Sequence, residues 1–364
     1  MSWLLAFLGF AALIVLHEAG HFAAAKAVGM RVERFALFFP PLIARRRRGE
    51  TEYAIGAIPL GGYVKITGMN PAEEIPPEHA HRAYFRQPVW KRVVVIVAGP
   101  AVNIVLAFLI LMGIFWANGT LEPPARVGTV QSGFPAAGVL ETGDVLVAVD
   151  GRPLVGDDLG AQTLAASERI ASHRCPGKPT AGCEAGEPVT LTIVRDGRRR
   201  SVQVTPVYDA ELKRTRLGLG FDGTHQPAGP VRAAGLSVDT MWAITRGTVE
   251  TIAGVFDREK REQISGVVGS YEVTRQAIEL DTTRALFLLA VISLSLGVIN
   301  LFPFLPLDGG HIFWAVAEKV RGKAIPFSIM ERAGFVGFVL VIGLFMIGFT
   351  NDIGRLTGEG FGVR

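Results

Sequence analysis

Hydrophobic residues in this chain are concentrated in four blocks, near residues 3–28, 93–117, 284–307 and 333–349. Each block is about as long as a helix needs to be to cross a lipid bilayer. The first block is not typical of a cleaved signal peptide, because no positively charged residue precedes it. The pattern therefore predicts a multi-pass α-helical membrane protein with about four transmembrane helices.

Composition and charge agree with this interpretation and orient the chain. Of the 364 residues, 49% are hydrophobic, and the mean hydropathy of +0.34 is high for a soluble protein. The region between the first two blocks carries a cluster of basic residues: Arg31, Arg34, Arg45, Arg46, Arg47, Arg48, Lys65, Arg82, Arg86, Lys91 and Arg92. The positive-inside rule places that region in the cytoplasm, so the N-terminus and the long segment 120–280 are predicted to be extracytoplasmic. The run Arg45–Arg48 has no interleaved aromatic residues, which indicates a membrane flank and no nucleic-acid partner.

Ionisable residues interrupt the first apolar block in the sequence His17-Glu18-Ala19-Gly20-His21. Positions i and i+4 lie on one face of a helix, so the two imidazoles can bind a single zinc ion. Glu18 can reach a water molecule on that ion without being a ligand itself. A five-residue pattern also arises by chance, but ionisable side chains in an apolar helix are costly and usually functional.

A catalytic zinc ion normally has three protein ligands, and the end of the third block offers the missing one. Asp308 follows a Pro-broken apolar segment at the cytoplasmic end of that block, the depth inferred for His17 and His21. A lone buried carboxylate would be expensive there, whereas a carboxylate on a cation is satisfied. His311 is a second candidate for the ligand, and a helix-capping role for Asp308 is the structural alternative.

Three further features surround these residues. Residues 51–65 form short β-like runs around Gly61-Gly62-Tyr63, which suits a β-hairpin that enters the membrane beside the site, or else an ordinary cytoplasmic hairpin. Asn103 follows Gly99-Pro100 inside the second block, where it either packs against the first helix or forms a hydrogen bond with it. Asn300 lies before the prolines of the third block and can donate a hydrogen bond to a substrate carbonyl or to an oxyanion.

Residues 126–206 have the composition of a small soluble domain. The segment 133–151, with Gly143-Asp144 and a terminal Asp150-Gly151, resembles the signature of a PDZ domain. Strand-like runs at 189–195 and 201–205 flank an Asp-Gly turn. Cys175 and Cys183 form either a small disulfide or two free thiols, of which an extracytoplasmic location favours the disulfide. Residues 238–256 have the pattern of an interfacial amphipathic helix.

Taken together, these motifs resemble the site-2 proteases, intramembrane zinc metalloproteases, and in particular the bacterial RseP-like members, with one PDZ domain in place of two. The resemblance implies Zn²⁺ as cofactor, His17, His21 and Asp308 as its ligands, and Glu18 as catalytic base. It also implies a location in the bacterial inner membrane, with the active site near the cytoplasmic side. The substrates implied are single-pass transmembrane proteins, such as anti-sigma factors or signal-peptide remnants. Residues expected to bind them are Asn300, Gly61, Gly62, Tyr63 and Asn103.

The predicted fold is thus a multi-pass helical membrane protein with a membrane-associated β-hairpin and an extracytoplasmic PDZ-like α/β domain. Residues 1–119 hold the first two transmembrane helices and the β segment, and 120–210 the PDZ-like domain, with a groove where an extracytoplasmic peptide can add a strand. Residues 211–283 are a linker with the amphipathic helix, and 284–364 hold the last two transmembrane helices and the third zinc ligand. Two other functions fit parts of this pattern: a membrane-anchored PDZ scaffold with a structural metal site, and a metal transporter.

Overall fold

The computed structural model describes residues 1–364 except 71–72, 157–158, 178, 211, 213, 259–260, 262–263, 324 and 359–364. Pro71 of the proline-rich stretch before the second block, and the last residues of the 284–364 segment, lie outside the described residues. The chain forms two compact units, which are described separately below. One comprises Met1–Ile114 with Ala234–Arg364, and the other comprises Phe115–Ala233.

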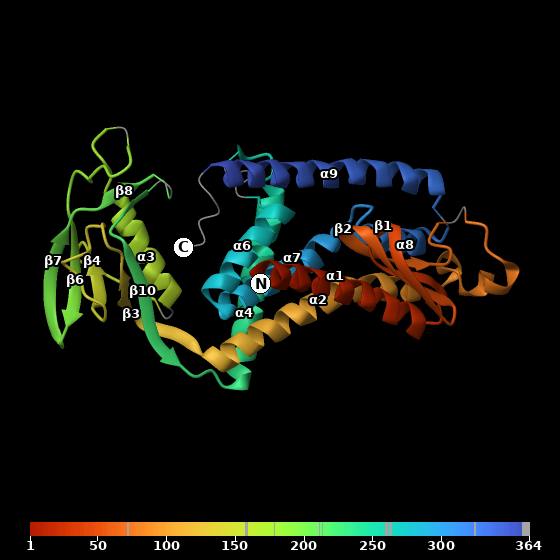
Figure 1. Cartoon of the computed structure of the whole chain (residues 1–364), viewed down its shortest axis with the longest axis horizontal. Coiled ribbons are helices and arrows are strands. Elements are labelled where there is room, and N and C mark those ends of the chain that lie inside the picture. The colour runs from red at the N-terminus through yellow and green to blue at the C-terminus, as the bar shows by residue number, and fades with distance from the viewer. Residues whose placement is uncertain are drawn as a thin grey trace. The chain divides into compact units, whose positions relative to one another are not determined.

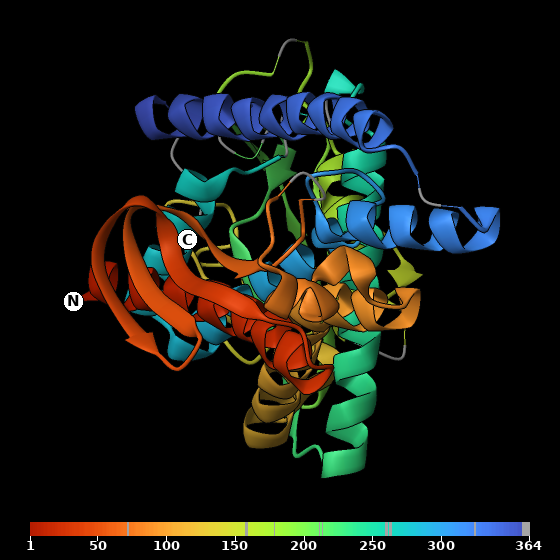
Figure 2. The same ribbon diagram turned by 90° about the vertical axis from the view of Figure 1, so that its right-hand side faces the viewer.

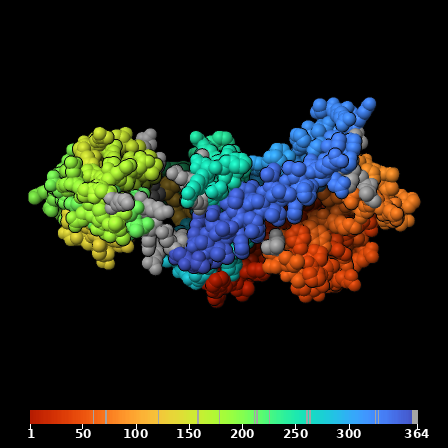
Figure 3. Space-filling view, turned by 90° about the horizontal axis from the view of Figure 1, so that it is seen from above, coloured from red at the N-terminus to blue at the C-terminus, as the bar shows by residue number. Residues whose placement is uncertain are grey.

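Four helices of the described chain are long and apolar enough to cross a membrane. They are α1 (Ser2–Ala27), α2 (Val89–Asn118), α7 (Thr282–Asn300) and α9 (Phe327–Thr357). Large hydrophobic side chains remain exposed along them, and α9, the dark blue helix of Figure 3, is the most exposed of the four. Such exposure suits contact with lipid. The structure thus confirms the predicted multi-pass helical architecture.

The third apolar block is a shorter helix than its hydropathy predicts. α7 ends at Asn300, and residues 301–307 form a tight connection that leads into the separate helix α8 (Asp308–Arg321). Pro303 and Pro306 lie in this connection and cannot continue a helix, since proline has no N–H to donate. The break makes Asp308 the first residue of α8.

Two long strands, β1 (Val32–Arg48) and β2 (Thr51–Ile66), form a sheet beside α1 (Figures 1 and 2). Both strands bend and pair twice, since Arg34 lies opposite both Glu52 and Lys65. The register gives the order 42–48, 51–56, 32–37 and 62–66, so the segments 42–48 and 62–66 are the two edges.

The sheet follows α1 along much of its length. The ring of Phe22 packs against Phe35 at 5.5 Å, and the ring of Phe7 lies 5.9 Å from Phe38. Phe7 and Phe22 are separated by about four turns of the spanning helix. This favours the predicted membrane-associated sheet over an ordinary cytoplasmic hairpin.

Two 3₁₀ turns and two further helices complete this unit. They are the 3₁₀ turns η1 (Pro77–Arg82) and η2 (Tyr84–Arg86), and the helices α4 (Pro230–Ala253) and α6 (Val267–Leu280), of which α4 begins just before the boundary of the unit at Ala234. The fully buried carboxylate of Asp352 in α9 accepts hydrogen bonds from the backbone N–H groups of Gly266 and Gly269 at the start of α6. A carboxylate at a helix N-terminus is favoured by the helix dipole, so Asp352 is satisfied without a metal or a basic partner.

The second unit is an α/β domain around a six-stranded sheet. Its strands are β3 (Thr120–Val130), β4 (Val145–Val149), β5 (Arg152–Pro153), β6 (Val189–Arg195), β7 (Arg198–Val204) and β10 (Leu219–Gln226), with order β10-β3-β4-β6-β7 and β5 on β4. Helix α3 (Leu159–Ser172) and the strand pair β8 (Val207–Asp209) and β9 (Arg214–Arg216) complete it. Alternate residues of β6, from Val189 to Ile193, are buried, as a strand with one face on a core requires.

Two details of this unit extend the sequence analysis. The sheet continues beyond residue 210, where the PDZ-like segment was predicted to end, because β10 pairs with β3. Cys175 and Cys183 are joined by a disulfide bond, so the structure has the favoured alternative of the two.

Candidate metal centre

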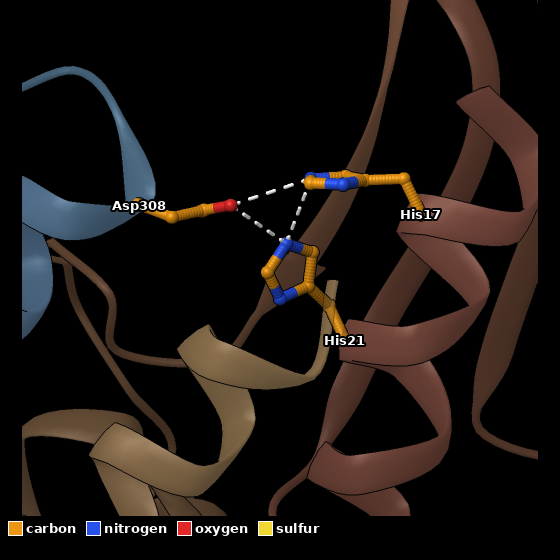
Figure 4. Close-up of side chains that lie close together, drawn as sticks. All are labelled: His17, His21 and Asp308. Atoms are coloured by element: carbon orange, nitrogen blue, oxygen red, sulfur yellow. Dashed lines mark hydrogen bonds and ion pairs between the residues drawn. The ribbon is translucent and has the colours of Figure 1, made fainter. Parts of the chain in front are cut away.

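His17 and His21 lie on one face of α1 and are both buried. Their Nε2 atoms are 3.2 Å apart. The helical spacing of four residues brings the two rings together, as the sequence predicted. In Figure 4 both imidazoles point toward the same place.

The carboxylate of Asp308 meets these rings from α8 (Figure 4). Its Oδ2 lies 3.3 Å from His17 Nε2 and 3.2 Å from His21 Nε2. The connection 301–307 reaches this position by folding back on the start of α8, where Cβ atoms at Gly309 and Gly310 would overlap the backbone of Leu301 and Leu305. The Gly-Gly pair is therefore required for the approach of Asp308.

The three donor atoms fit a tetrahedral zinc ion. Ligand atoms about 2.0–2.1 Å from such an ion lie about 3.3 Å from one another, and the three edges of this triangle are 3.2, 3.2 and 3.3 Å. Within the described part of the chain, these are the residues whose donor atoms form a metal-type cluster. His311 is not among them, so the triangle is completed by Asp308 and not by its predicted rival.

A backbone carbonyl fixes the orientation of His21. The carbonyl oxygen of Val95 in α2 lies 2.8 Å from His21 Nδ1. A carbonyl can only accept, so Nδ1 carries the proton and Nε2 presents a lone pair toward His17 and Asp308. The lone pair of His21 Nε2 therefore faces the Asp308 carboxylate and His17 Nε2, an arrangement that suits a bound cation.

The contact with α2 depends on two residues of the Gly-Pro sequence. A Cβ atom at Gly99 would overlap the His21 ring, 2.6 Å from Cε1. Pro100 lies inside α2 and removes the N–H that would bond to the carbonyl of Ile96, next to Val95. The absence of a side chain at Gly99 therefore lets α2 lie close to the His21 ring, where the carbonyl of Val95 contacts Nδ1.

The side chain of Glu18 extends from α1 toward the β1–β2 sheet. A Cβ atom at Gly62 would be 2.8 Å from Glu18 Cγ and 3.0 Å from the carbonyl oxygen of Ala36. The edge segment 62–66 of β2 thus begins directly beside the predicted catalytic base. Gly61 precedes it against the ring of Phe39, and the ring of Tyr63 stacks on Phe39 at 6.0 Å.

The two predicted asparagines lie in the neighbouring helices. Asn103 is fully buried in α2, and neither atom of its side-chain amide has a hydrogen-bond partner. Its backbone carbonyl accepts a hydrogen bond from Ser293 of α7 at 2.9 Å. Asn300 is the last residue of α7 and is half-buried.

An ion pair that the sequence analysis did not identify holds α8 against α2. Arg92 is 7% exposed and donates to both carboxylate oxygens of Glu318, at 3.0 and 2.9 Å. Such a two-point contact fixes direction as well as distance. No spacing rule connects residues this far apart in the chain, so only the fold reveals the pair.

Comparison with known proteins places this chain in a family. The model of Peptidase family M50 matches residues 5–344. The chain belongs to this family. This member of family M50 is 30% identical to the zinc metalloprotease Rip1 of Mycobacterium tuberculosis, over 93% of this chain and 94% of Rip1. It is 31% identical to a putative zinc metalloprotease of Nostoc sp., over 99% and 98% of the two chains.

Part of the chain also matches a solved PDZ domain. The SdrC-like protein of Listeria monocytogenes matches with 18% identity and a TM-score of 0.21, over 27% of this chain and 85% of that domain. The family assignment confirms the predicted site-2 protease type, the enzyme class of zinc metalloprotease, and zinc as the cofactor.

Proposed function

We propose that this chain is an intramembrane endopeptidase that cuts the transmembrane segments of single-pass membrane proteins. The observation that carries the proposal is the triangle of His17, His21 and Asp308, with donor atoms 3.2–3.3 Å apart and Glu18 one residue from the first histidine. These residues lie on a spanning helix and at the start of α8. The chemistry is therefore directed at a peptide bond within the membrane.

Each residue has a distinct role in this proposal. His17, His21 and Asp308 would hold the zinc ion, which would acidify a water molecule and polarise the scissile carbonyl. Glu18 would act as general base toward the attacking water and as general acid toward the leaving amine. Val95 keeps His21 in the tautomer that binds metal. Asn300 and Asn103 are proposed to bind the substrate, and the unpaired, buried amide of Asn103 is a donor and acceptor available for it.

The edge segment 62–66 of β2 is the proposed substrate guide. A transmembrane helix hides its carbonyl groups in its own hydrogen bonds, so it must unwind before it is cut. An edge strand offers free backbone groups with which an unwound segment can pair. A shallow hollow lined by Tyr63, Val64, Lys65, Ile66, Met69, Asn70 and Glu73 follows this edge. The edge segment begins at Gly62, where a Cβ atom would lie 2.8 Å from Glu18 Cγ, so its first residue lies beside Glu18.

We further propose that the PDZ-like unit is extracytoplasmic and that the enzyme resides in a bacterial inner membrane. The Cys175–Cys183 disulfide supports this orientation, since disulfides persist outside the reducing cytoplasm. The basic region before α2 supports a cytoplasmic location for the β1–β2 side. Substrates of this proposed topology are anti-sigma factors or signal-peptide remnants, and a peptide in the PDZ groove is a further proposed partner. The predicted division at residues 119, 210 and 283 remains part of this proposal, with β10 (Leu219–Gln226) as an added strand on the sheet of the PDZ-like unit.

The three-donor site favours an enzyme over a scaffold with a structural metal. Structural zinc is normally closed by four protein ligands, whereas catalytic zinc keeps a position for water. The described residues supply three donors here.

The test uses the purified chain in lipid nanodiscs with a fluorescent single-pass membrane substrate. Glu18→Gln is nearly isosteric and leaves the three donors intact. We expect zinc content equal to wild type and cleavage reduced by at least about a thousandfold, since the base is lost. A Glu18→Gln protein that cleaves at the wild-type rate would reject the proposed mechanism.

A further inference from the structure

The arginine run Arg45–Arg48 forms the outer edge of the β1–β2 sheet. The segment 42–48 pairs on one side with 51–56, and its other side has no neighbouring strand among the described residues. All four arginines are exposed. Because side chains alternate along a strand, Arg45 and Arg47 lie on one face of the sheet, and Arg46 and Arg48 on the other.

Most basic residues around this edge are paired with carboxylates, but the run itself is not. Lys26 and Arg82 pair with Glu50, Arg31 and Lys65 with Glu33, and Arg34 with Glu52. Within the described chain, the side chains of Arg46, Arg47 and Arg48 make no hydrogen bond or ion pair, and Arg45 only approaches Glu52 at 3.9 Å. The nearby carboxylates thus form ion pairs with other basic residues, and the edge has an excess of positive charge.

Contacts inside the sheet fix the level of the run along α1. Arg46 pairs with Tyr53, whose ring packs against Phe22 at 6.0 Å. Glu50, in the turn after Arg48, forms ion pairs with Lys26 in the last turn of α1 and with Arg82. The four arginines therefore lie beside the last turns of a spanning helix, where the hydrocarbon region of the bilayer ends.

Apolar residues continue the same surface toward the other end of α1. Ile43, two residues before Arg45, is 73% exposed, and Phe39, Ile55 and Ile58 of this sheet are also exposed. An apolar surface that changes into a basic edge at the end of a span matches the change from acyl chains to headgroups. Guanidinium groups bind phosphate oxygens with two parallel hydrogen bonds.

We propose that Arg45–Arg48 form a binding site for the phosphate headgroups of anionic phospholipids in the leaflet that contains the end of α1. The exposed residues Ile43 and Phe39 contact the acyl chains of the same lipids. Bound lipid holds the sheet, and with it the edge segment beside Glu18, at a fixed depth in the bilayer. The site does not depend on catalysis, so lipid binding is measured separately from proteolysis.

The test compares variants of the full-length protein reconstituted in phosphatidylcholine nanodiscs with and without phosphatidylglycerol. Native mass spectrometry counts the phosphatidylglycerol retained after mild detergent extraction. The variant R45Q/R46Q/R47Q/R48Q should lose about fivefold in retained anionic lipid for each arginine that contributes. Replacement of all four by lysine keeps the charge and should retain most of the binding. The matched control is R198Q/R199Q/R200Q, an exposed arginine run on the edge strand β7, which should retain lipid as wild type does.

Two further measurements on the wild-type protein test the proposal even if the glutamine variant does not fold. For wild type, raising salt from about 0.05 M to about 0.5 M should reduce retained phosphatidylglycerol several-fold, since exposed charges are screened. Inorganic phosphate at millimolar concentration should not displace the lipid, because it has no acyl chains. Equal lipid retention by wild type and R45Q/R46Q/R47Q/R48Q would overturn the proposal. So would an equal loss in the R198Q/R199Q/R200Q control, retention that does not change with salt, or displacement of the lipid by inorganic phosphate.

Discussion

Gly99 of α2 lies directly against the imidazole ring of His21 of α1, and a Cβ atom added at Gly99 would be 2.6 Å from His21 Cε1. Gly99→Ala should therefore displace His21 from the donor triangle. We expect zinc affinity to fall at least about tenfold, the size of effect seen when the orientation of a metal ligand is disturbed. Zinc titration of the purified, metal-depleted protein measures it.

The matched control for this substitution is Gly113→Ala. Gly113 lies in the same helix, and a Cβ atom there would have no neighbour within 4 Å. Zinc affinity should stay at the wild-type value. If Gly99→Ala and Gly113→Ala bind zinc equally well, the close contact between α2 and His21 has no role in metal binding.

Gly62→Ala should affect turnover and leave metal binding intact. Its new methyl group would lie 2.8 Å from Glu18 Cγ and 3.0 Å from the carbonyl oxygen of Ala36, so Glu18 or the edge of the sheet must shift. A small misplacement of a catalytic group costs on the order of tenfold or more in rate. Steady-state kinetics should show a lower kcat with one zinc ion per chain. Loss of zinc in this variant would contradict the separation of roles between the triangle and Glu18.

Removal of the Arg92–Glu318 pair should loosen the third ligand. Glu318→Gln leaves the guanidinium of Arg92 buried without its charged partner, which we expect to cost about 2–3 kcal/mol of stability. Because α8 also carries Asp308, zinc affinity should fall with it. The readouts are the free energy of unfolding in a denaturing detergent series and zinc titration.

A charge reversal and an exposed pair serve as controls for that prediction. Arg92→Glu combined with Glu318→Arg should recover part of the zinc affinity lost in either single variant. Glu250→Gln removes the partner of Arg246 on the exposed side of α4 and should have a much smaller effect. Unchanged zinc affinity in Glu318→Gln would show that α8 needs no anchor on α2.

Acid should weaken the anchor of the hairpin turn. Hydrogen bonds from Arg82 and then from Lys26 lower the pKa of Glu50 from 4.5 to about 2. A carboxyl group whose pKa is lower in the folded state stabilises the fold above its unfolded pKa, and that contribution is lost as pH falls from 4.5 toward 2. Thermal unfolding of wild type should therefore show a loss of stability in this range that Glu50→Gln lacks. Parallel curves for the two proteins would reject this role.

Helical spacing and the free-energy cost of burying ionisable side chains predicted much of the site from the sequence. The helical spacing of His17 and His21 is a local rule. Asp308 was predicted because a carboxylate in an apolar segment needs a cation, and the Gly309-Gly310 pair and the family resemblance favoured it over His311. The disulfide and the membrane-associated sheet followed from similar reasoning. These inferences were possible because each depends on residues close together in the chain or on the strong cost of desolvating a charged group.

The contacts that orient the site were not predictable in the same way. Val95 acts through its backbone carbonyl, which every residue has, and its role depends on how α2 packs. The Arg92–Glu318 pair joins helices far apart in the sequence. The prolines after Asn300 indicated a break in the third apolar block, but the way residues 301–307 fold back to place Asp308 at the start of α8 depends on long-range packing.

The central claim is that Asp308 completes a catalytic zinc site with His17 and His21. The most direct measurement is the zinc content of the purified protein, together with its cleavage of a single-pass membrane substrate, for wild type, Asp308→Ala and His311→Gln. The account predicts one zinc ion per chain and full cleavage for wild type and His311→Gln, and loss of both for Asp308→Ala. An Asp308→Ala protein that keeps its zinc and its cleavage, or a His311→Gln protein that loses them, would contradict it.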